Sequence, residues 1–276
     1  MNKLMLDDLL RRSLIEDIGF GDVTSDIIFS EDHISQGYLL AKQDLVLAGI
    51  KVFARAFTLL DDQVKILSHY DDGSWIKAGE KFATIAGPTR TLLTGERVAL
   101  NFLQHMSGIA TQTSRYVEAA KSFGTMIVDT RKTTPGLRML EKYAVNVGGG
   151  QNHRYALDSM VLIKDNHIQS AGGIISAVQR VRKQVSFSMK IEVEAENLDQ
   201  VQDALAVAVD VIMLDNMPLT MIQQAVQLIS GKALIEVSGN VTLERVAELA
   251  ASGVDIISSG ALTHSVTAAD ISMKLQ

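Results

Sequence analysis

The sequence predicts an α/β protein: an open, incomplete α/β barrel that follows a smaller, β-rich N-terminal region. Two observations lead to this expectation. Short apolar segments in the second half of the chain alternate with helical segments, which is typical of parallel βαβ units. Each apolar segment also ends in polar or ionisable residues. Such endings describe the carboxyl rim of a barrel, whereas a doubly wound sheet gathers them at one switch point.

The composition indicates a compact globular protein that does not bind nucleic acid. The chain has 276 residues, of which 47% are hydrophobic, enough for one or two domains with a sizeable core. The formal net charge of −6 argues against a nucleic-acid surface. No cysteine is present, which excludes disulfides and thiolate chemistry. Acidic residues interrupt the N-terminal apolar pattern and no long apolar run follows, so we expect a cytoplasmic protein without membrane spans.

The first elements in chain order are a helix and a set of short strands. Leu6, Leu10 and Leu14 recur at helical spacing before Gly19, which predicts an amphipathic helix that ends at this glycine. Residues 36–91 then change to short β-like runs separated by Gly, Asp and Pro turns. These runs predict a small β-rich domain.

A long helix is predicted next, at residues 94–120, with an interruption near Gly108. We expect the boundary between the two domains to fall in this helix. Its apolar residues cover more than one face, and we expect one face to pack against a second chain. These residues are Val98, Leu100, Phe102, Leu103 and Met106.

The strands of the predicted barrel are the apolar segments of the second half. They are residues 126–128, 160–163, 189–193, 211–214, 233–237 and 254–257. A seventh strand is considered around residues 143–147. With about seven strands the barrel would be incomplete.

Two short Gly and Ser loops follow the last two predicted strands. Residues 237–240 read VSGN and residues 258–265 read SSGALTHS, and each leads into a helical segment. A single Ser-Gly turn is usually only a turn. Small side chains and backbone N–H groups after the final strands of a barrel nevertheless form the phosphate site that many barrel enzymes share. We therefore predict a phosphate site here.

Acidic side chains lie near the ends of two predicted strands, 189–193 and 211–214, and they are Glu192, Glu194, Glu196 and Asp215. Alternation along a strand places Glu192 and Glu194 on the same face. An exposed carboxylate is most often solvated or paired with a lysine. Two functional readings stay open, because the carboxylates could hold a Mg²⁺ attached to a phosphate or could stabilise a developing oxocarbenium ion.

Cationic side chains gather after the first apolar and Gly-rich segments of the predicted barrel, although the protein is acidic overall. They are Arg131, Lys132, His153, Arg154 and Lys164. A surface ion pair would explain any one of them, but not the whole group at one rim. Arginine binds planar carboxylates in bidentate fashion and lysine supplies a point charge, so the group predicts a substrate with several negative groups. The histidine spacing does not fit zinc, and no Walker, HExxH or serine-elbow motif is present.

These motifs, in this order, resemble one known family. The segments are LLTGERVALNFLQHMSGIAT, DTRKTTPGLR, GGGQNHR, LIKDNH, IEVEAENLD, IMLDN, EVSGN and SSGALTHS, and they span nearly the whole chain. They are similar to nicotinate-nucleotide pyrophosphorylase (carboxylating), also called quinolinate phosphoribosyltransferase. The resemblance implies an N-terminal α/β sandwich domain at residues 1–110, joined by the C-terminal tail, and a seven-stranded open α/β barrel at residues 111–276.

The resemblance also implies an activity, a cofactor and partners. The family is a glycosyltransferase family of the pentosyltransferase class. It converts quinolinate and phosphoribosyl pyrophosphate to nicotinate mononucleotide, CO₂ and pyrophosphate in de novo NAD biosynthesis, with Mg²⁺. The implied partners are these two small-molecule substrates and a second copy of the chain. The resemblance implies a homodimer, or a higher assembly of dimers, with shared active sites.

Residue roles follow from the positions of the motifs. The two carboxylates of quinolinate would be held by Arg131, His153, Arg154 and Lys164, with Arg97 added from the neighbouring subunit. Lys132 would lie where the sugar pyrophosphate and quinolinate meet. The catalytic residues would be Lys132, Glu194 and Asp215, of which the two acids would also face the ribose and its Mg²⁺. The remaining substrate contacts, including those to the 5-phosphate, would come from Thr130, Ser238, Gly239, Asn240, Ser259 and Gly260.

The sequence departs from the family pattern at two positions, and other readings remain. Ala156 stands where glycine is frequent and Ser259 where a larger residue is usual, but neither change removes a charge. A nicotinate phosphoribosyltransferase, or the homologue associated with molybdenum transport, would share the barrel. Its single-carboxylate acceptor would not need the whole set of cations. A non-catalytic phosphate-sugar binding protein has no reason to combine Lys132, Glu194 and Asp215.

Overall fold

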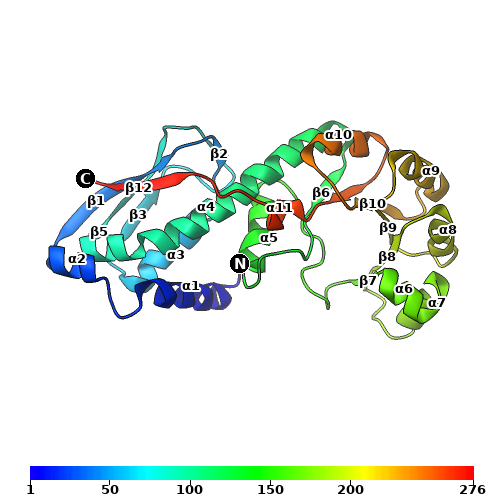
Figure 1. Ribbon diagram of the computed structural model, residues 1–276, viewed down its shortest axis with the longest axis horizontal. Coiled ribbons are helices and arrows are strands. Elements are labelled where there is room, and N and C mark those ends of the chain that lie inside the picture. The colour runs from blue at the N-terminus through cyan, green and yellow to red at the C-terminus, as the bar shows by residue number, and fades with distance from the viewer. The chain divides into compact units, whose positions relative to one another are not determined.

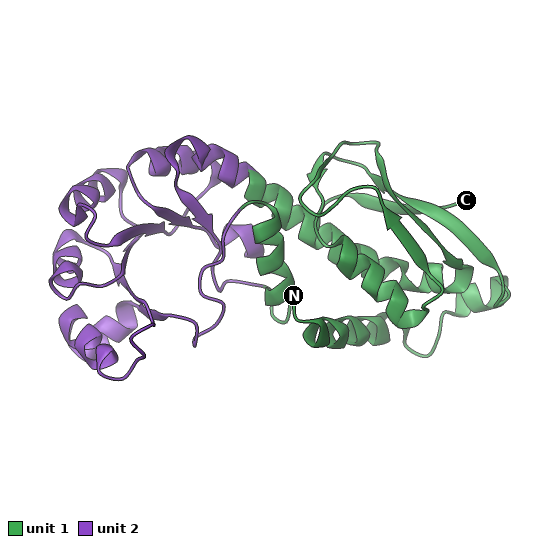
Figure 2. Cartoon of the chain, turned by 180° about the vertical axis from the view of Figure 1, so that it is seen from behind, with its two compact units in different colours: residues 1–114, 134–149, 265–276 green, residues 115–133, 150–264 purple.

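The computed structural model describes residues 1–276 (Figure 1), and the chain forms two compact units (Figure 2). Unit 1 consists of residues 1–114, 134–149 and 265–276, and unit 2 of residues 115–133 and 150–264. One helix, α4 (Thr89–Ala120), belongs to both units, and the expected boundary between residues 110 and 111 lies in it. Both units are therefore discontinuous in sequence.

Unit 1 is built on a four-stranded antiparallel sheet with the strand order β12–β1–β5–β3 (Figure 1). The strands are β1 (Ile34–Ala41), β3 (Lys65–Ser68), β5 (Lys81–Pro88) and β12 (Ile271–Leu275), and β2 (Leu45–Val46) pairs separately with β4 (Trp75–Ile76). The last strand of the chain, β12, pairs with β1. A side chain at Gly37 would come within 2.4 Å of the Lys274 carbonyl oxygen, so this pairing requires glycine.

Helices complete unit 1. The first is α1 (Lys3–Ile18), which is capped by Asn2 at its start. It ends at Gly19, with a φ of 57°, as the sequence predicts. It is followed by α2 (Val23–Ile28) and α3 (Ile50–Leu60). Phe53 and Phe57 of α3 pack edge to face and are fully buried, as is Phe82 of β5. These three phenylalanines are the largest fully buried side chains of unit 1.

Two expectations for the helices are wrong. No break occurs in α4 at Gly108, where a side chain would lie 2.3 Å from the Thr267 carbonyl oxygen. Glycine at this position allows the C-terminal segment to approach and does not kink the helix. No strand forms at residues 143–147, because they end the helix α5 (Arg138–Val147). Its buried apolar residues, Leu140, Ala144 and Val145, have helical spacing.

The apolar face that α4 was expected to offer to a second chain is also absent. All the residues of that pattern are buried within the single chain, namely Val98, Leu100, Phe102, Leu103 and Met106. A helix that is apolar on several faces can be surrounded by its own domain. The pattern is thus explained without a partner.

Unit 2 contains a six-stranded parallel sheet with the strand order β6–β11–β10–β9–β8–β7. The strands are β6 (Met126–Val128), β7 (Val161–Ile163), β8 (Ile191–Ala195), β9 (Val211–Asp215), β10 (Leu234–Ser238) and β11 (Ile256–Ser258). All of them overlap predicted segments. The two edge strands, β6 and β7, do not pair with each other, so the barrel is open. It has six strands where about seven were expected.

Helices lie outside the arc of strands in unit 2 (Figure 2). They are α6 (Asp165–Ala171), α7 (Ile174–Arg182), α8 (Leu198–Ala206), α9 (Leu219–Ile229), α10 (Leu243–Ala251) and α11 (Ala261–His264), and the 3-10 turn η1 (Lys121–Phe123) precedes β6. All six helices except α6 bury apolar residues, as α9 does with Ile222, Ala225 and Ile229. Because all six strands run the same way, their carboxyl ends form one rim. No helix in either unit has the length and apolar character to cross a membrane.

Candidate active site

The carboxyl ends of the parallel strands surround a pocket of about 1100 Å³ that lies wholly in unit 2. The expected site residues that line it are Thr130, Arg131, Lys132, His153, Arg154, Lys164, Glu194, Asp215, Ser238, Gly239 and Asn240. Residues far apart in the sequence are thus brought together because each follows a strand of the same rim.

The cationic side chains of the pocket come from three segments. Arg131 follows β6, Arg154 lies in the segment that bridges to β6, and Lys164 immediately precedes α6. Burial and the charge of Arg131 both lower the pKa of Arg154. A guanidinium group whose charge is disfavoured by a neighbouring cation is stabilised when an anion binds beside it, so this side of the pocket suits an anionic ligand.

The backbone of Lys132 is held from both sides. Its N–H donates to Thr130 Oγ1 at 3.0 Å, and its carbonyl oxygen accepts from Thr263 Oγ1 at 2.8 Å. Gly260 lies next to it, because a side chain there would be 3.0 Å from Lys132 Cδ. The main chain at Lys132 is therefore fixed, while the side chain is exposed in the pocket.

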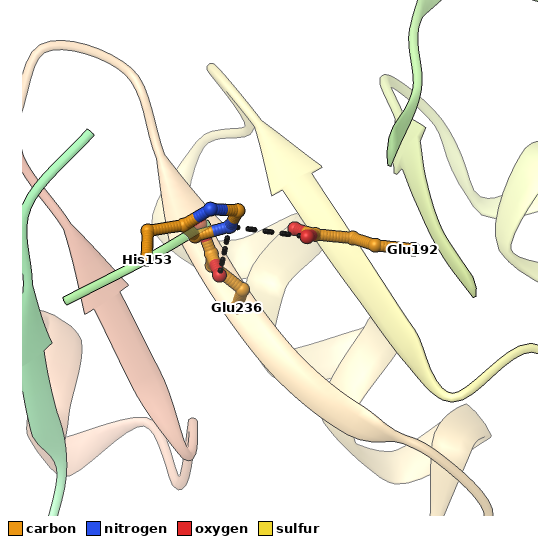
Figure 3. A group of neighbouring side chains, drawn as sticks. All are labelled: His153, Glu192 and Glu236. Atoms are coloured by element: carbon orange, nitrogen blue, oxygen red, sulfur yellow. Dashed lines mark ion pairs between the residues drawn. The ribbon is translucent and has the colours of Figure 1, made fainter. Parts of the chain in front are cut away.

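His153 lies between two buried glutamates (Figure 3). Its Nε2 is 3.0 Å from Glu192 Oε2 and 3.5 Å from Glu236 Oε2, and both glutamate side chains are almost completely buried. Burial alone would lower the pKa of His153, but the two carboxylates outweigh it and raise the pKa to about 10. Burial also raises the pKa of Glu192. Asp129 fixes the loop, since its Oδ1 accepts from the His153 backbone N–H at 2.9 Å.

Two contacts of the His153 ring favour opposite protonation states. Nδ1 accepts the N–H of Arg154 at 2.8 Å, which favours a neutral ring, whereas the glutamates at Nε2 favour the cation. A neutral hydrogen bond contributes about 1 kcal/mol. Leaving a buried carboxylate without a counter-charge costs about 3–5 kcal/mol. We therefore assign a cationic imidazole at neutral pH.

The same three side chains are the one set of three His or acidic residues close enough together to hold a metal ion. Their ligand atoms lie within 4.8 Å of one another. Both oxygens of Glu192 and Oε1 of Glu236 accept no hydrogen bond, so the contact between Glu192 and His153 is an ion pair without hydrogen-bond alignment. The imidazole is already the counter-charge of this group. We therefore interpret it as charge compensation beneath the anion site.

Glu194 and Asp215 stand at the ends of the neighbouring strands β8 and β9 and face the pocket. Glu194 forms an ion pair with Lys164. Asp215 Oδ2 accepts a hydrogen bond from Asn216 Nδ2 at 2.9 Å. Carboxylate oxygens on adjacent strands are the ligand type that Mg²⁺ prefers, so these two residues could hold one.

The loop after β10 has the geometry of an anion site. Gly239 and Asn240 have φ angles of 91° and 48°, and their N–H groups donate to no protein acceptor. A side chain at position 239 would lie 2.2 Å from Asn216 Oδ1, so glycine is required there. Successive backbone N–H groups at the end of a strand form a concavity that binds phosphate.

Three expected site residues do not line the pocket. Ser259 is buried and its hydroxyl donates to the Val241 carbonyl oxygen at 3.4 Å, whereas the preceding Ser258 does line the pocket. Gly260 contacts Lys132 and lies behind it. Arg97 is an exposed residue of α4 in unit 1.

The sequence did not predict the pair of buried glutamates at His153. Glu236 was missed, and Glu192 was considered only as one of several rim acids. Both stand inside strands, in the repeated Ile-Glu-Val segments of β8 and β10. A glutamate within an apolar strand was the available signal, because charged residues are almost never fully buried without a partner.

Comparison with known proteins gives matches along nearly the whole chain. Residues 22–107 match the family model of the quinolinate phosphoribosyl transferase N-terminal domain, and residues 109–274 match that of the C-terminal domain. The probable nicotinate-nucleotide pyrophosphorylase (carboxylating) of Bacillus subtilis (strain 168) is 44% identical over 273 residues, which cover 99% of this chain and 94% of the relative. The corresponding protein of Synechocystis sp. is 46% identical over 275 residues, which cover 99% and 93%.

Solved structures are similar over the same length. NadC from Streptococcus pyogenes has a TM-score of 0.97 and 44% sequence identity, with 100% of this chain and 98% of that chain covered. The nicotinate-nucleotide pyrophosphorylase from Francisella tularensis has a TM-score of 0.96 and 38% identity, with the same coverage.

Proposed function

The chain belongs to the quinolinate phosphoribosyl transferase family, and on this premise we propose that the pocket of unit 2 is where the reaction of that family takes place. The chain is an enzyme of de novo NAD synthesis. It transfers a phosphoribosyl group to quinolinate and forms nicotinate mononucleotide, CO₂ and pyrophosphate. The observation that supports this location is the pairing of a cationic pocket with carboxylates and a phosphate loop on one rim.

Quinolinate binds, in this proposal, to the cationic side of the pocket through Arg131, His153, Arg154 and Lys164. The two guanidinium forks match two adjacent carboxylates in shape and charge. The His153 imidazolium, whose charge is compensated by Glu192 and Glu236, lies beneath them. A single-carboxylate acceptor such as nicotinate would leave part of this positive charge uncompensated. The number of cations therefore favours the dicarboxylate.

Phosphoribosyl pyrophosphate binds with its 5-phosphate on the loop at Ser238, Gly239 and Asn240, close to Ser259 and Gly260. Glu194 and Asp215 would hold Mg²⁺, directly or through water, and their oxygen donors fit this ion. When bound, the ion would offset the charge of the leaving pyrophosphate. Lys132 would add positive charge where the pyrophosphate and quinolinate meet.

The residues of the chain then act mainly by charge and orientation. As pyrophosphate leaves, C1 of the ribose becomes cationic, and the carboxylate of Glu194 or Asp215 stabilises it. The pyridine nitrogen of quinolinate, held by the arginines, attacks C1. The resulting pyridinium stabilises the carbanion that remains when the adjacent carboxylate leaves as CO₂, and a proton taken up at this carbon completes nicotinate mononucleotide. The protein therefore needs only to orient the ring and keep water out.

We further propose that two chains form a dimer in which Arg97 completes the pocket of the other chain. Arg97 is exposed in α4. Large apolar side chains are exposed on the N-terminal helices and the loop between them, among them Leu4, Ile15, Phe20, Val23 and Ile27. An exposed apolar patch of this kind marks an interaction surface.

The cytoplasmic location of the protein remains a prediction.

One experiment tests the activity and the choice of substrate. The protein is incubated with phosphoribosyl pyrophosphate, Mg²⁺ and either quinolinate or nicotinate, and CO₂ and nicotinate mononucleotide are measured. We expect both products from quinolinate and no nucleotide from nicotinate. Equal use of nicotinate would identify a nicotinate phosphoribosyltransferase, and binding without any product would identify a phosphate-sugar binding protein.

A further inference from the structure

We propose that Asn216 is a positioning residue, which links the phosphate loop after β10 to the carboxylate of Asp215 so that the two parts of the site are held together. The proposal rests on the proposed function, because it assigns Asp215 to the ribose and its Mg²⁺. Asn216 itself is not assigned a contact with either substrate.

The link is a chain of side-chain hydrogen bonds across the rim. Asn216 Nδ2 donates to Asp215 Oδ2 at 2.9 Å, and Asn216 Oδ1 accepts from Asn240 Nδ2 at 3.1 Å. The Asn216 backbone N–H also donates to the Ser238 carbonyl oxygen at 3.0 Å. A carboxylate can only accept, so the amide nitrogen must face Asp215 and the direction of the whole chain is fixed. All four residues line the pocket.

The backbone places the two asparagines against each other. Asn216 has a φ of 53° and Asn240 a φ of 48°, a left-handed conformation that asparagine tolerates better than most residues. Gly239 packs directly on the Asn216 amide, since a side chain there would be 2.2 Å from Asn216 Oδ1. Strained residues of this kind collect at ligand-binding sites.

This geometry has a consequence for Asp215. One of its oxygens is occupied by Asn216, so the carboxylate cannot rotate freely and its other oxygen is directed for the ligand. A phosphate that binds the Gly239–Asn240 loop also orders Asn240, and through Asn216 it orders Asp215. Binding of the 5-phosphate should therefore assist the carboxylate that acts at C1.

A simpler explanation is that Asn216 only adopts the backbone conformation of the turn. Substitutions at position 216 can distinguish this explanation from the proposed link to Asp215. Glycine, aspartate and asparagine all adopt the left-handed conformation. Glycine has no amide, and aspartate cannot donate to Asp215 and adds a like charge beside it. If the turn is all that matters, Asn216→Gly and Asn216→Asp should behave like the wild type. Ser230→Gly is the matched control, because Ser230 has a φ of 46° and lies outside the pocket.

The test measures catalysis and binding separately. In the CO₂-release assay we expect kcat to fall about tenfold or more in Asn216→Gly and at least as far in Asn216→Asp, which is the loss expected for a hydrogen bond to a charged group. The KM for quinolinate should stay within about twofold, because the cationic side of the pocket is intact. Calorimetry with phosphoribosyl pyrophosphate and Mg²⁺, without quinolinate, should show about tenfold weaker binding in both variants. Ser230→Gly should match the wild type in every measurement.

A double variant tests the route through Asp215. In an Asp215→Asn background, Asn216→Gly should lower kcat by less than about twofold, because its effect has already been lost. Wild-type kcat and binding in either Asn216 variant, or losses that multiply fully in the double variant, would overturn the proposal. If Asn216→Gly unfolds, Asn216→Asp decides. If the wild type and Ser230→Gly release no CO₂, the proposed function fails. The calorimetry with phosphoribosyl pyrophosphate then decides alone whether Asn216 positions the site for this ligand.

Discussion

At the scale of single residues, the pocket depends on the shape of its cations as well as on their charge. Lysine in place of Arg131 or Arg154 keeps the charge but loses the planar fork. We expect either change to weaken quinolinate binding by roughly 2–5 kcal/mol in calorimetry, since the groups are partly desolvated. Arg180→Lys, at an exposed position of α7, should bind like the wild type. Unchanged binding in both pocket variants would contradict the assigned dicarboxylate site.

Asp215 should matter more for turnover than for quinolinate binding. A group that stabilises charge mainly in the transition state lowers kcat when it is removed, while substrate affinity changes little. We therefore expect Asp215→Asn to reduce kcat by about a hundredfold or more, with quinolinate affinity changed by less than about threefold. Equal losses in the two quantities would indicate a structural role.

His153 should make stability depend on pH. Its pKa is near 6.5 in the unfolded chain and about 10 in the folded protein, so folding holds the proton more tightly. The stabilising contribution is therefore complete below about pH 6.5 and is lost as pH rises through about 10. The raised pKa of Glu192 acts in the same direction. Denaturant titrations should show the wild type losing more unfolding free energy than His153→Gln between pH 7 and 10.

Binding gives a second measure of the same proton. Quinolinate affinity should persist at pH 8 to 9, where an ordinary histidine is neutral. An affinity that falls with a midpoint near pH 6.5 would show that His153 is not held as a cation.

At the scale of elements, Gly108 makes a sharp prediction. Alanine normally favours a helix over glycine by about 1 kcal/mol. Here the added Cβ would lie 2.3 Å from the Thr267 carbonyl oxygen, which is too close, so the backbone at one of the two residues must shift. We expect Gly108→Ala to destabilise the protein by about 1–3 kcal/mol in urea unfolding, as overpacking does. Asn101→Ala, at an exposed position of the same helix, should be neutral or stabilising, and a stabilised Gly108→Ala would contradict the contact.

The elements of unit 2 could be predicted because their signals are local. An apolar run followed by a polar residue marks a strand and its rim, so Arg131, Lys164 and Asp215 were found from the sequence alone. The helix α5 was less clear, because the short apolar stretch at residues 143–147 fits a strand as well as the end of a helix. The role of Gly108 depends on Thr267, a neighbour that only the folded chain supplies.

The parts of the site that the sequence did not predict also depend on neighbours that only the folded chain supplies. Glu236 lies within a strand, and its only clue is a charge in an apolar run. Its partner His153 is far away in sequence. The hydrogen bond between Asn216 and Asn240 forms only because β9 and β10 are neighbours in the sheet. Long-range pairing of this kind cannot be read from local patterns.

At the scale of the whole molecule, the proposed dimer predicts complementation. Chains with Arg97→Ala and chains with Lys132→Ala should each be inactive alone. Mixed and allowed to exchange subunits, they should regain activity, because a mixed dimer contains one site with both residues intact. Remixing wild-type chains under the same conditions is the control for losses during exchange. A mixture that stays inactive, although mass spectrometry shows the mixed dimer, would contradict the shared site.

The pairing of β12 with β1 bears on how the protein is made. The last strand of the chain completes the sheet whose other strands lie in the first 88 residues. During synthesis the edge of β1 that faces β12 therefore stays unpaired until residues 271–275 have been made, while its other edge can pair with β5. An open strand edge can pair with another nascent chain, so this interval is when aggregation threatens most. Gly37 lets β12 approach β1 closely, and unit 1 becomes complete only when β12 has emerged.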